Sequence, residues 1–113
     1  MCIRDSTTLE STIQHLTQAP ARLFGLRERG ELHEGWHADI VVFDPEAIAC
    51  DEVVMRNDLP GGTKRLYAEA TGISRVLVNG QVTVADGQAS EATPGVVFRS
   101  GKDTETVKIP ADA

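Results

Sequence analysis

The most informative part of the chain is Gly30-Glu-Leu-His-Glu-Gly-Trp-His-Ala-Asp-Ile-Val-Val-Phe-Asp44, because it supports two opposed interpretations. As letters alone, His33 to His37 match H-E-x-x-H, the zinc signature of many metalloproteases. With its flanks, the same stretch is a glycine turn that leads into an extended apolar strand. The first interpretation predicts a metal site in this chain, and the second predicts a structural segment.

The zinc interpretation requires a helix through residues 33–37, because two histidines share one zinc ion only when they lie one helical turn apart. Gly35 interrupts that segment, and a glycine inside a helix costs about 1 kcal/mol relative to alanine. The β-branched and aromatic residues 40–43 follow, and Pro45 pushes the residue before it to extended geometry. The only other histidine, His15, lies upstream in a different element. We therefore expect a turn and a strand, without zinc.

The composition limits the number of domains and the classes of partner that the chain can have. At 113 residues, with 41% hydrophobic and 25% charged residues, the chain is ordinary for one soluble domain or part of one. A formal net charge of −6 argues against nucleic acid and anionic membranes as partners, since both need a basic patch. No apolar run approaches the roughly 18 residues of a membrane span. Cys2 and Cys50 form no C-x-x-C pair, and no signal peptide is recognisable, so we expect free thiols in a cytoplasmic protein.

Residues 1–6, Met-Cys-Ile-Arg-Asp-Ser, resemble translated adapter sequence at the ends of reading frames assembled from environmental reads. We expect this segment to be non-native, with the natural chain continuing upstream. The alternative is a genuine start followed by a short disordered end.

Two short helices are expected next. Thr7-x-x-Glu10 has the form of a capping box, in which hydroxyl and carboxylate satisfy orphan N–H groups. Thr17 is expected to cap a second helix, which Gly25 ends as a C-cap. The apolar positions of the two helices are Leu9, Ile13, Leu16, Leu23 and Phe24.

The β pattern begins after Gly30. Leu32 is expected to start a strand, Gly35 to turn it, and residues 38–43 to form an apolar strand buried on both faces. Residues 45–72, punctuated by proline and glycine, are expected to be an irregular loop. A loop of that length usually marks a functional or partner-covered segment.

A hairpin is the clearest local prediction. Residues 73–78 and 81–85 flank Asn79-Gly80, and both turn residues tolerate the positive φ of a type I′ turn. Asp86-Gly87 is expected to turn the chain again. Two further extended runs are expected at residues 96–98 and 106–109.

Short motifs occur in one order along about residues 8–107. They are Thr-Gln-Ala-Pro-Ala-Arg-Leu-Phe-Gly-Leu at 17–26, Arg29-Gly30, Gly35, Ala-Asp-Ile-Val-Val-Phe-Asp at 38–44, Asp-Leu-Pro-Gly-Gly at 58–62, Gly72-Ile73, Val78-Asn-Gly80, Asp86-Gly87, Pro94-Gly95 and Arg-Ser-Gly-Lys-Asp-Thr-Glu-Thr at 99–106. Together they resemble the C-terminal part of amidohydrolase superfamily enzymes, and in particular the group that includes N-acyl-D-amino-acid deacylases.

The resemblance implies a metal-dependent (β/α)8 barrel joined to a small β-sandwich built from both ends of the chain. The barrel would carry the zinc ligands and the aspartate that activates water. A mainly β fragment with N-terminal helices is then expected, with residues 7–27 as closing barrel helices and residues 28–113 as the C-terminal portion of the sandwich. Its partners would be the missing N-terminal barrel and a small-molecule amide substrate, with zinc in the full-length enzyme and none in this fragment.

No catalytic or metal-binding residue is assigned here, because no H-x-H motif follows a strand and Asp39 and Asp44 are expected within the sandwich strand. Substrate-binding residues are unknown. The turn at 58–62 could face a substrate, and Lys64 with Arg65 could bind a carboxylate, although such features are more often plain turns and solvated charges. Ser6 and Ser11 lack the histidine and acid of a serine hydrolase triad.

These features support two alternative hypotheses about the function of the chain. The first is a C-terminal fragment of an amidohydrolase that cuts a non-peptide C–N bond, in N-acyl-D-amino-acid deacylation, and that lacks the catalytic site. The alternative is a stand-alone β-rich binding or scaffold module without catalysis. The DNA upstream of Thr7 distinguishes them, since a barrel-coding frame with histidine pairs supports the first and a promoter with a ribosome site supports the second.

Overall fold

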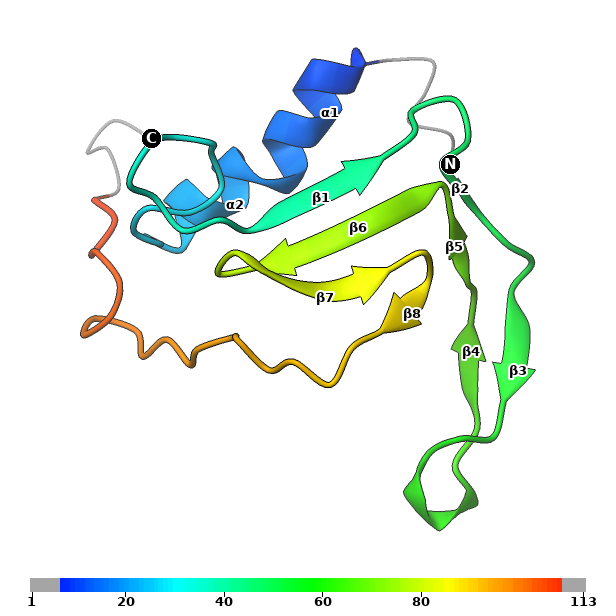
Figure 1. Cartoon of the computed structure of the whole chain (residues 1–113). Coiled ribbons are helices and arrows are strands. Elements are labelled where there is room, and N and C mark those ends of the chain that lie inside the picture. Colours follow the sequence, from blue (N-terminus) through cyan, green and yellow to red (C-terminus); the bar gives the residue numbers. More distant parts are fainter. Residues whose placement is uncertain (1–6, 109–113) are drawn as a thin grey trace. The chain divides into compact units, whose positions relative to one another are not determined.

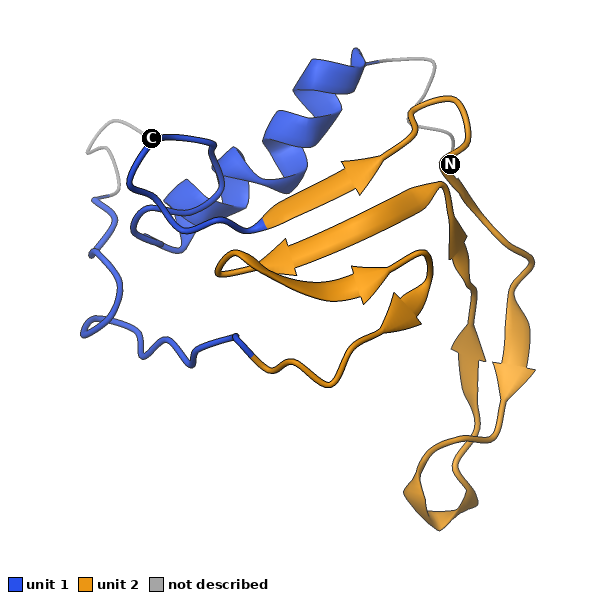
Figure 2. Ribbon diagram, in the orientation of Figure 1, with its two compact units in different colours: residues 1–39, 94–113 blue, residues 40–93 orange. Residues whose placement is uncertain are grey.

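The computed structural model describes residues 7–108, which are mainly β, as predicted (Figure 1). The predicted adapter-derived segment at 1–6, with Cys2, and the Ile109 end of the last predicted strand lie outside this range. Residues 40–93 form one compact unit, and the described residues on either side of them form another (Figure 2). The elements are α1 Leu9–Leu16, α2 Gln18–Leu23, β1 Ile40–Phe43, β2 Ala49–Cys50, β3 Val54–Arg56, the 3-10 turn η2 Pro60–Gly62, β4 Arg65–Tyr67, β5 Ala70–Thr71, β6 Ile73–Val78, β7 Gln81–Ala85 and β8 Gln88–Ala89.

Helix α1 begins one residue later than the sequence predicts. Its N-cap is Thr8, whose side-chain hydroxyl accepts a hydrogen bond of 3.2 Å from the backbone N–H of Ser11. The predicted capping box of Thr7 with Glu10 is therefore wrong. Thr7 instead contacts the hydroxyl of Thr12 at 2.9 Å. Two adjacent threonines are chemically equivalent as caps, so the choice between them depends on where helical geometry starts.

Helix α2 follows directly and ends as predicted. Thr17 holds the N-cap position, but its hydroxyl donates to the carbonyl of Ile13 at 2.8 Å and caps nothing. At the other end Gly25 has φ +64, and the next residue, Leu26, donates to the carbonyl of Ala21 at 2.8 Å. This is the bond pattern of a glycine-terminated helix, and it leaves Ala21 buried in this unit.

Strand β1 is shorter and more open than predicted. Leu32 is exposed and lies in no strand, and the strand spans only residues 40–43. Val41 and Val42 keep about half of their surface, so the prediction of a strand buried on both faces is wrong. The reason is that no second layer from residues 40–93 packs over these side chains. An apolar run indicates that a strand is buried in the complete protein, but it does not identify the segment that covers the strand.

The unit of residues 40–93 contains a four-stranded antiparallel sheet with the order β1-β6-β7-β8. The predicted hairpin of β6 and β7 is confirmed: Asn79 and Gly80 have φ of 49° and 78°, as a type I′ turn requires. Val76 pairs with Val84, and Val82 pairs with Leu77 because a bulge shifts the register between these pairs. Strand β6 is paired on both edges, with β1 and with β7, and its side chains are all partly buried.

Residues 45–72 are not an irregular loop, so that prediction is wrong. Strands β2 and β5 pair with each other, β3 pairs with β4, and η2 closes the ribbon (Figure 1). We call residues 49–71 the β-arm. Its strands have only two or three residues each, and charged side chains break the apolar alternation, so no strand period is visible in the sequence.

The remaining predicted strands are absent from the described residues. Residues 96–98 and 106–108 form no strand, and Val97 is among the most exposed apolar side chains. Within residues 7–108, neither length nor hydropathy allows any helix to span a bilayer.

Candidate functional site

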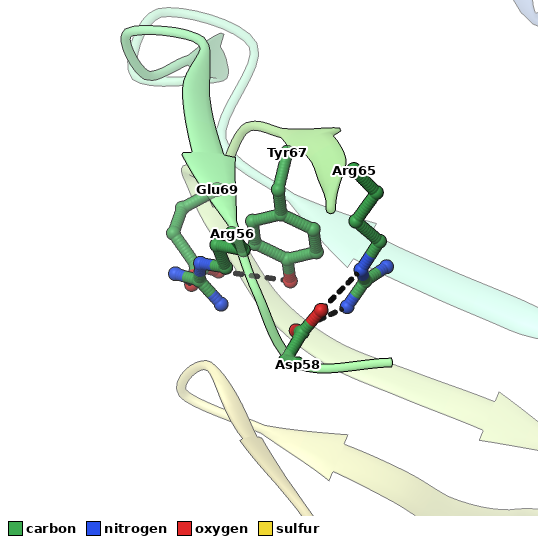
Figure 3. Close-up of polar contacts among 5 residues, drawn as sticks. All are labelled: Arg56, Asp58, Arg65, Tyr67 and Glu69. Carbon is green, nitrogen blue, oxygen red and sulfur yellow. Dashed lines mark hydrogen bonds and ion pairs between the residues drawn. The ribbon is translucent and has the colours of Figure 1, made fainter. Parts of the chain in front are cut away.

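A group of polar side chains lies together on one face of the β-arm, which we call the arm cluster. The register places Arg56 directly opposite Arg65, and Val54 opposite Tyr67. Because alternate side chains of a strand point to the same face, both arginines and the tyrosine share one side of the ribbon. Figure 3 shows the members of the cluster, which are Arg56, Asp58, Arg65, Tyr67 and Glu69.

Each guanidinium of the arm cluster is paired with a carboxylate. Arg65 donates to both oxygens of Asp58, from Nε at 2.8 Å and from Nη2 at 2.7 Å, a bidentate geometry. Arg56 donates from Nη2 to Glu69 at 2.5 Å, and the hydroxyl of Tyr67 donates to the second oxygen of Glu69 at 3.3 Å. The cluster therefore carries equal numbers of positive and negative groups.

The ring of Tyr67 lies between the two cations. The guanidinium carbon of Arg56 is 3.9 Å from the ring centroid and that of Arg65 is 4.7 Å from it. Two like charges directly opposite each other on neighbouring strands destabilise a ribbon. The aromatic face attracts both cations, and the two carboxylates offset the remaining repulsion. The cluster thus holds β3 and β4 together at a point where the cross-strand pair alone would separate them.

The electrostatics of the cluster favour its charged form. Hydrogen bonds from Arg65 hold the pKa of Asp58 below its usual range, and the same bonds raise the pKa of Arg65. Both groups therefore stay ionised near neutral pH, which is unsuited to a general acid or base. The arrangement can brace the ribbon and present charge, but it contains no nucleophile paired with a base.

The sequence indicated part of this cluster. Of the residues considered there, the structure brings Asp58 and Arg65 together and leaves Lys64 outside the group. Arg56, Tyr67 and Glu69 were missed. The available signal was the period of two in Arg65-Leu-Tyr67-Ala-Glu69, which places alternate polar residues on one face of a strand.

The H-E-x-x-H stretch is a turn, as predicted, and contains no helix. Gly35 has φ +84, and the two histidines have different neighbours: His33 lies 3.0 Å from Glu31, and His37 lies 3.9 Å from Glu28. The helical geometry that places both imidazoles on one zinc ion is therefore missing. Across residues 7–108, no group of three or more His, Cys, Asp or Glu side chains could hold a metal ion.

Asp39 and Asp44 flank strand β1 instead of lying within it, which corrects the sequence prediction. Asp39 forms an ion pair with Arg29, whose guanidinium stands 5.0 Å over the ring of Phe98. Asp44 accepts the backbone N–H of Glu46 at 2.9 Å and so closes the turn after the strand. Both contacts have a structural role.

Ser11 has a histidine nearby, since its hydroxyl lies 3.4 Å from Nδ1 of His15, one turn along α1. The same nitrogen is closer, at 2.6 Å, to the backbone carbonyl oxygen of Ser11. No carboxylate of the described residues pairs with His15, so a catalytic triad is not formed here.

Residues 2–84 match the sequence model of a family described as "Amidohydrolase family". The chain is similar to three enzymes of Alcaligenes xylosoxydans xylosoxydans. It is 38% identical to an N-acyl-D-glutamate deacylase over 92 residues, which are 81% of this chain and 17% of that protein. It is 36% identical to an N-acyl-D-aspartate deacylase over 95 residues, 83% of this chain and 17% of that protein.

The third relative is a D-aminoacylase, 40% identical over 72 residues that make up 64% of this chain and 13% of that enzyme. The chain therefore spans about a sixth of the length of the first two relatives. No solved structure matches the chain significantly.

Proposed function

The chain belongs to the amidohydrolase family, and from this premise we propose that it is the C-terminal part of a hydrolase acting on carbon–nitrogen bonds other than peptide bonds. Identities of 36–40% with three deacylases over most of the chain carry this proposal. The substrates would be N-acyl-D-amino acids, and the enzyme would be cytoplasmic. In this enzyme, a (β/α)8 barrel upstream would be joined to a β-sandwich to which the present strands contribute.

The described residues support a non-catalytic part of such an enzyme. Helices α1 and α2 expose the apolar side chains Leu16 and Leu23, as does Phe24 directly after α2, and a soluble protein rarely leaves such surface open unless it is an interface. These helices would close the barrel. The half-exposed Val41 and Val42 of β1 would be covered by the other layer of the sandwich.

The zinc that the family resemblance implies does not fit the described residues. His33 and His37 lie in a turn beside different glutamates, and residues 7–108 hold no other set of ligands. We therefore place the metal ligands and the water-activating aspartate outside residues 7–108, and assign the arm cluster no chemical step.

The test is to express the full-length product of the gene and, separately, residues 7–113. Release of free amino acid would be measured from N-acetyl-D-glutamate, N-acetyl-D-aspartate and a neutral N-acetyl-D-amino acid, with the L-enantiomers as controls. We expect chelator-sensitive turnover of a D-substrate by the full-length protein only.

Chelator-sensitive turnover by residues 7–113 alone would overturn the assignment of catalysis to the upstream part. An inactive full-length protein, tried on several N-acyl and cyclic amides, would overturn the substrate class. A promoter and ribosome site directly upstream of Thr7 would instead support a stand-alone module.

A further inference from the structure

The face of the β-arm opposite the arm cluster is apolar and open. Met55 and Leu66 are direct cross-strand partners, and Val53 directly precedes strand β3. Their exposed fractions are 62% for Met55, 69% for Leu66 and 62% for Val53. We call these three side chains the apolar arm face.

The two faces of the arm differ in what they leave exposed to water. The charged face has already satisfied its guanidinium and carboxylate groups internally, whereas the apolar face has no cover from the described residues. A two-stranded ribbon is marginal in water on its own. Burying these three apolar side chains would be favourable, because it removes apolar surface from water. The β-arm would therefore be stabilised if its apolar face packed against another apolar surface.

A second copy of the chain cannot use this face alone. An aromatic side chain buries about 150–250 Å², so three smaller side chains that are already partly covered offer less than roughly 450 Å² together. A stable interface between separate molecules buries about 800 Å² on each partner. A patch of this size is sufficient only when its partner is already held nearby, as in one polypeptide, where the effective concentration is high.

We propose that the apolar arm face docks on an apolar patch of the upstream, catalytic part of the same polypeptide. This rests on the proposed function, since the similar deacylases are about six times longer than the matched segment. The Arg56–Tyr67–Arg65 stack braces the ribbon before docking, so less conformational entropy is lost when the face is buried.

Oxidation of Met55 by hydrogen peroxide tests the docking directly. The thioether reacts to a sulfoxide when peroxide can reach it, and mass spectrometry of the peptide that contains Met55 gives the rate. We expect rapid oxidation in the 113-residue chain and at least a roughly tenfold slower reaction in the full-length protein. Equal rates would overturn the proposal. Protection of the 113-residue chain that grows with its concentration would show a second copy and would overturn it as well.

A pair of variants of the full-length protein provides the second measurement. Leu66→Asp places a charge on the apolar arm face, and Thr63→Asp places the same charge at an exposed position of the arm outside that face. We expect Leu66→Asp, but not Thr63→Asp, to lower the thermal midpoint and to restore rapid oxidation of Met55. Equal behaviour of the two variants would contradict docking. Deacylase activity is read separately, so an inactive protein with a protected Met55 refutes the proposed function and leaves the docking standing.

Discussion

Glu105 donates its backbone N–H to the carbonyl of Gly25 at 2.8 Å, which joins the end of helix α2 to the C-terminal segment of the same unit. The approach is so close that a Cβ on Gly25 would lie 2.0 Å from the carbonyl oxygen of Glu105. Gly25 also has φ +64, a conformation that side chains disfavour. One residue therefore ends a helix and admits the backbone of a segment distant in sequence.

Replacing Gly25 by alanine should destabilise the protein by more than the backbone conformation alone explains. The positive φ costs about 1–2 kcal/mol, and the overlap with Glu105 adds about 1–3 kcal/mol. Urea unfolding followed by Trp36 fluorescence measures the loss. Gly101→Ala is the matched control, since Gly101 has φ +76 and a Cβ at that position would meet no atom within 4 Å. Equal losses in both variants would argue against the close approach.

Gly80→Val should destabilise the β6–β7 hairpin, because a β-branched residue resists the φ of 78° in the type I′ turn. The expected cost is about 1–2 kcal/mol, seen as a lower thermal midpoint. Gly80→Asn is the control, since asparagine tolerates positive φ and should lose much less. An unchanged midpoint for the valine variant would contradict the turn assignment.

Removing either histidine of the H-E-x-x-H stretch should not change metal content. His33→Ala and His37→Ala remove half-exposed side chains from a turn that lacks zinc-binding geometry. The zinc content of the purified full-length protein, measured by elemental analysis, should equal that of the wild type. Stoichiometric loss of zinc in one of these variants would refute the structural interpretation of the turn.

The Asp58–Arg65 pair should make a small, pH-dependent contribution to stability. The pKa of Asp58 is lowered in the folded protein, so its contribution is present at neutral pH and is lost as the pH falls through that lowered value. The stability difference between wild type and Asp58→Asn should therefore shrink in acid. The pair is exposed, so the difference is modest and decreases with salt.

The control for this series is Glu52→Gln, which removes an acid of the β-arm outside the arm cluster. Its effect should not follow the acid titration of Asp58. If the difference caused by Asp58→Asn were constant from neutral to acid pH, Arg65 would not be the group that stabilises the charged carboxylate.

Local predictions succeeded where one or two residues restrict the backbone. Asn79-Gly80 forms the predicted turn, Gly25 ends α2, and Gly35 prevents a helix across the histidines. The predictions from sequence were wrong where burial or strand pairing depends on contacts between distant segments. The burial expected for residues 38–43 is absent, and the loop expected at residues 45–72 is a paired ribbon.

The turns could be predicted from the amino acids alone, because backbone preferences at glycine and asparagine act over a few residues. The order of the motifs along the chain indicated the family. The pairing of Arg56 with Arg65 beside Tyr67, and the exposure of Met55 and Leu66, became known from the folded chain. Strand register is set by pairing between segments distant in sequence, and a shift of one residue would exchange the charged and apolar faces. Local propensity selects the conformation of a residue, whereas pairing and burial between distant segments select its neighbours.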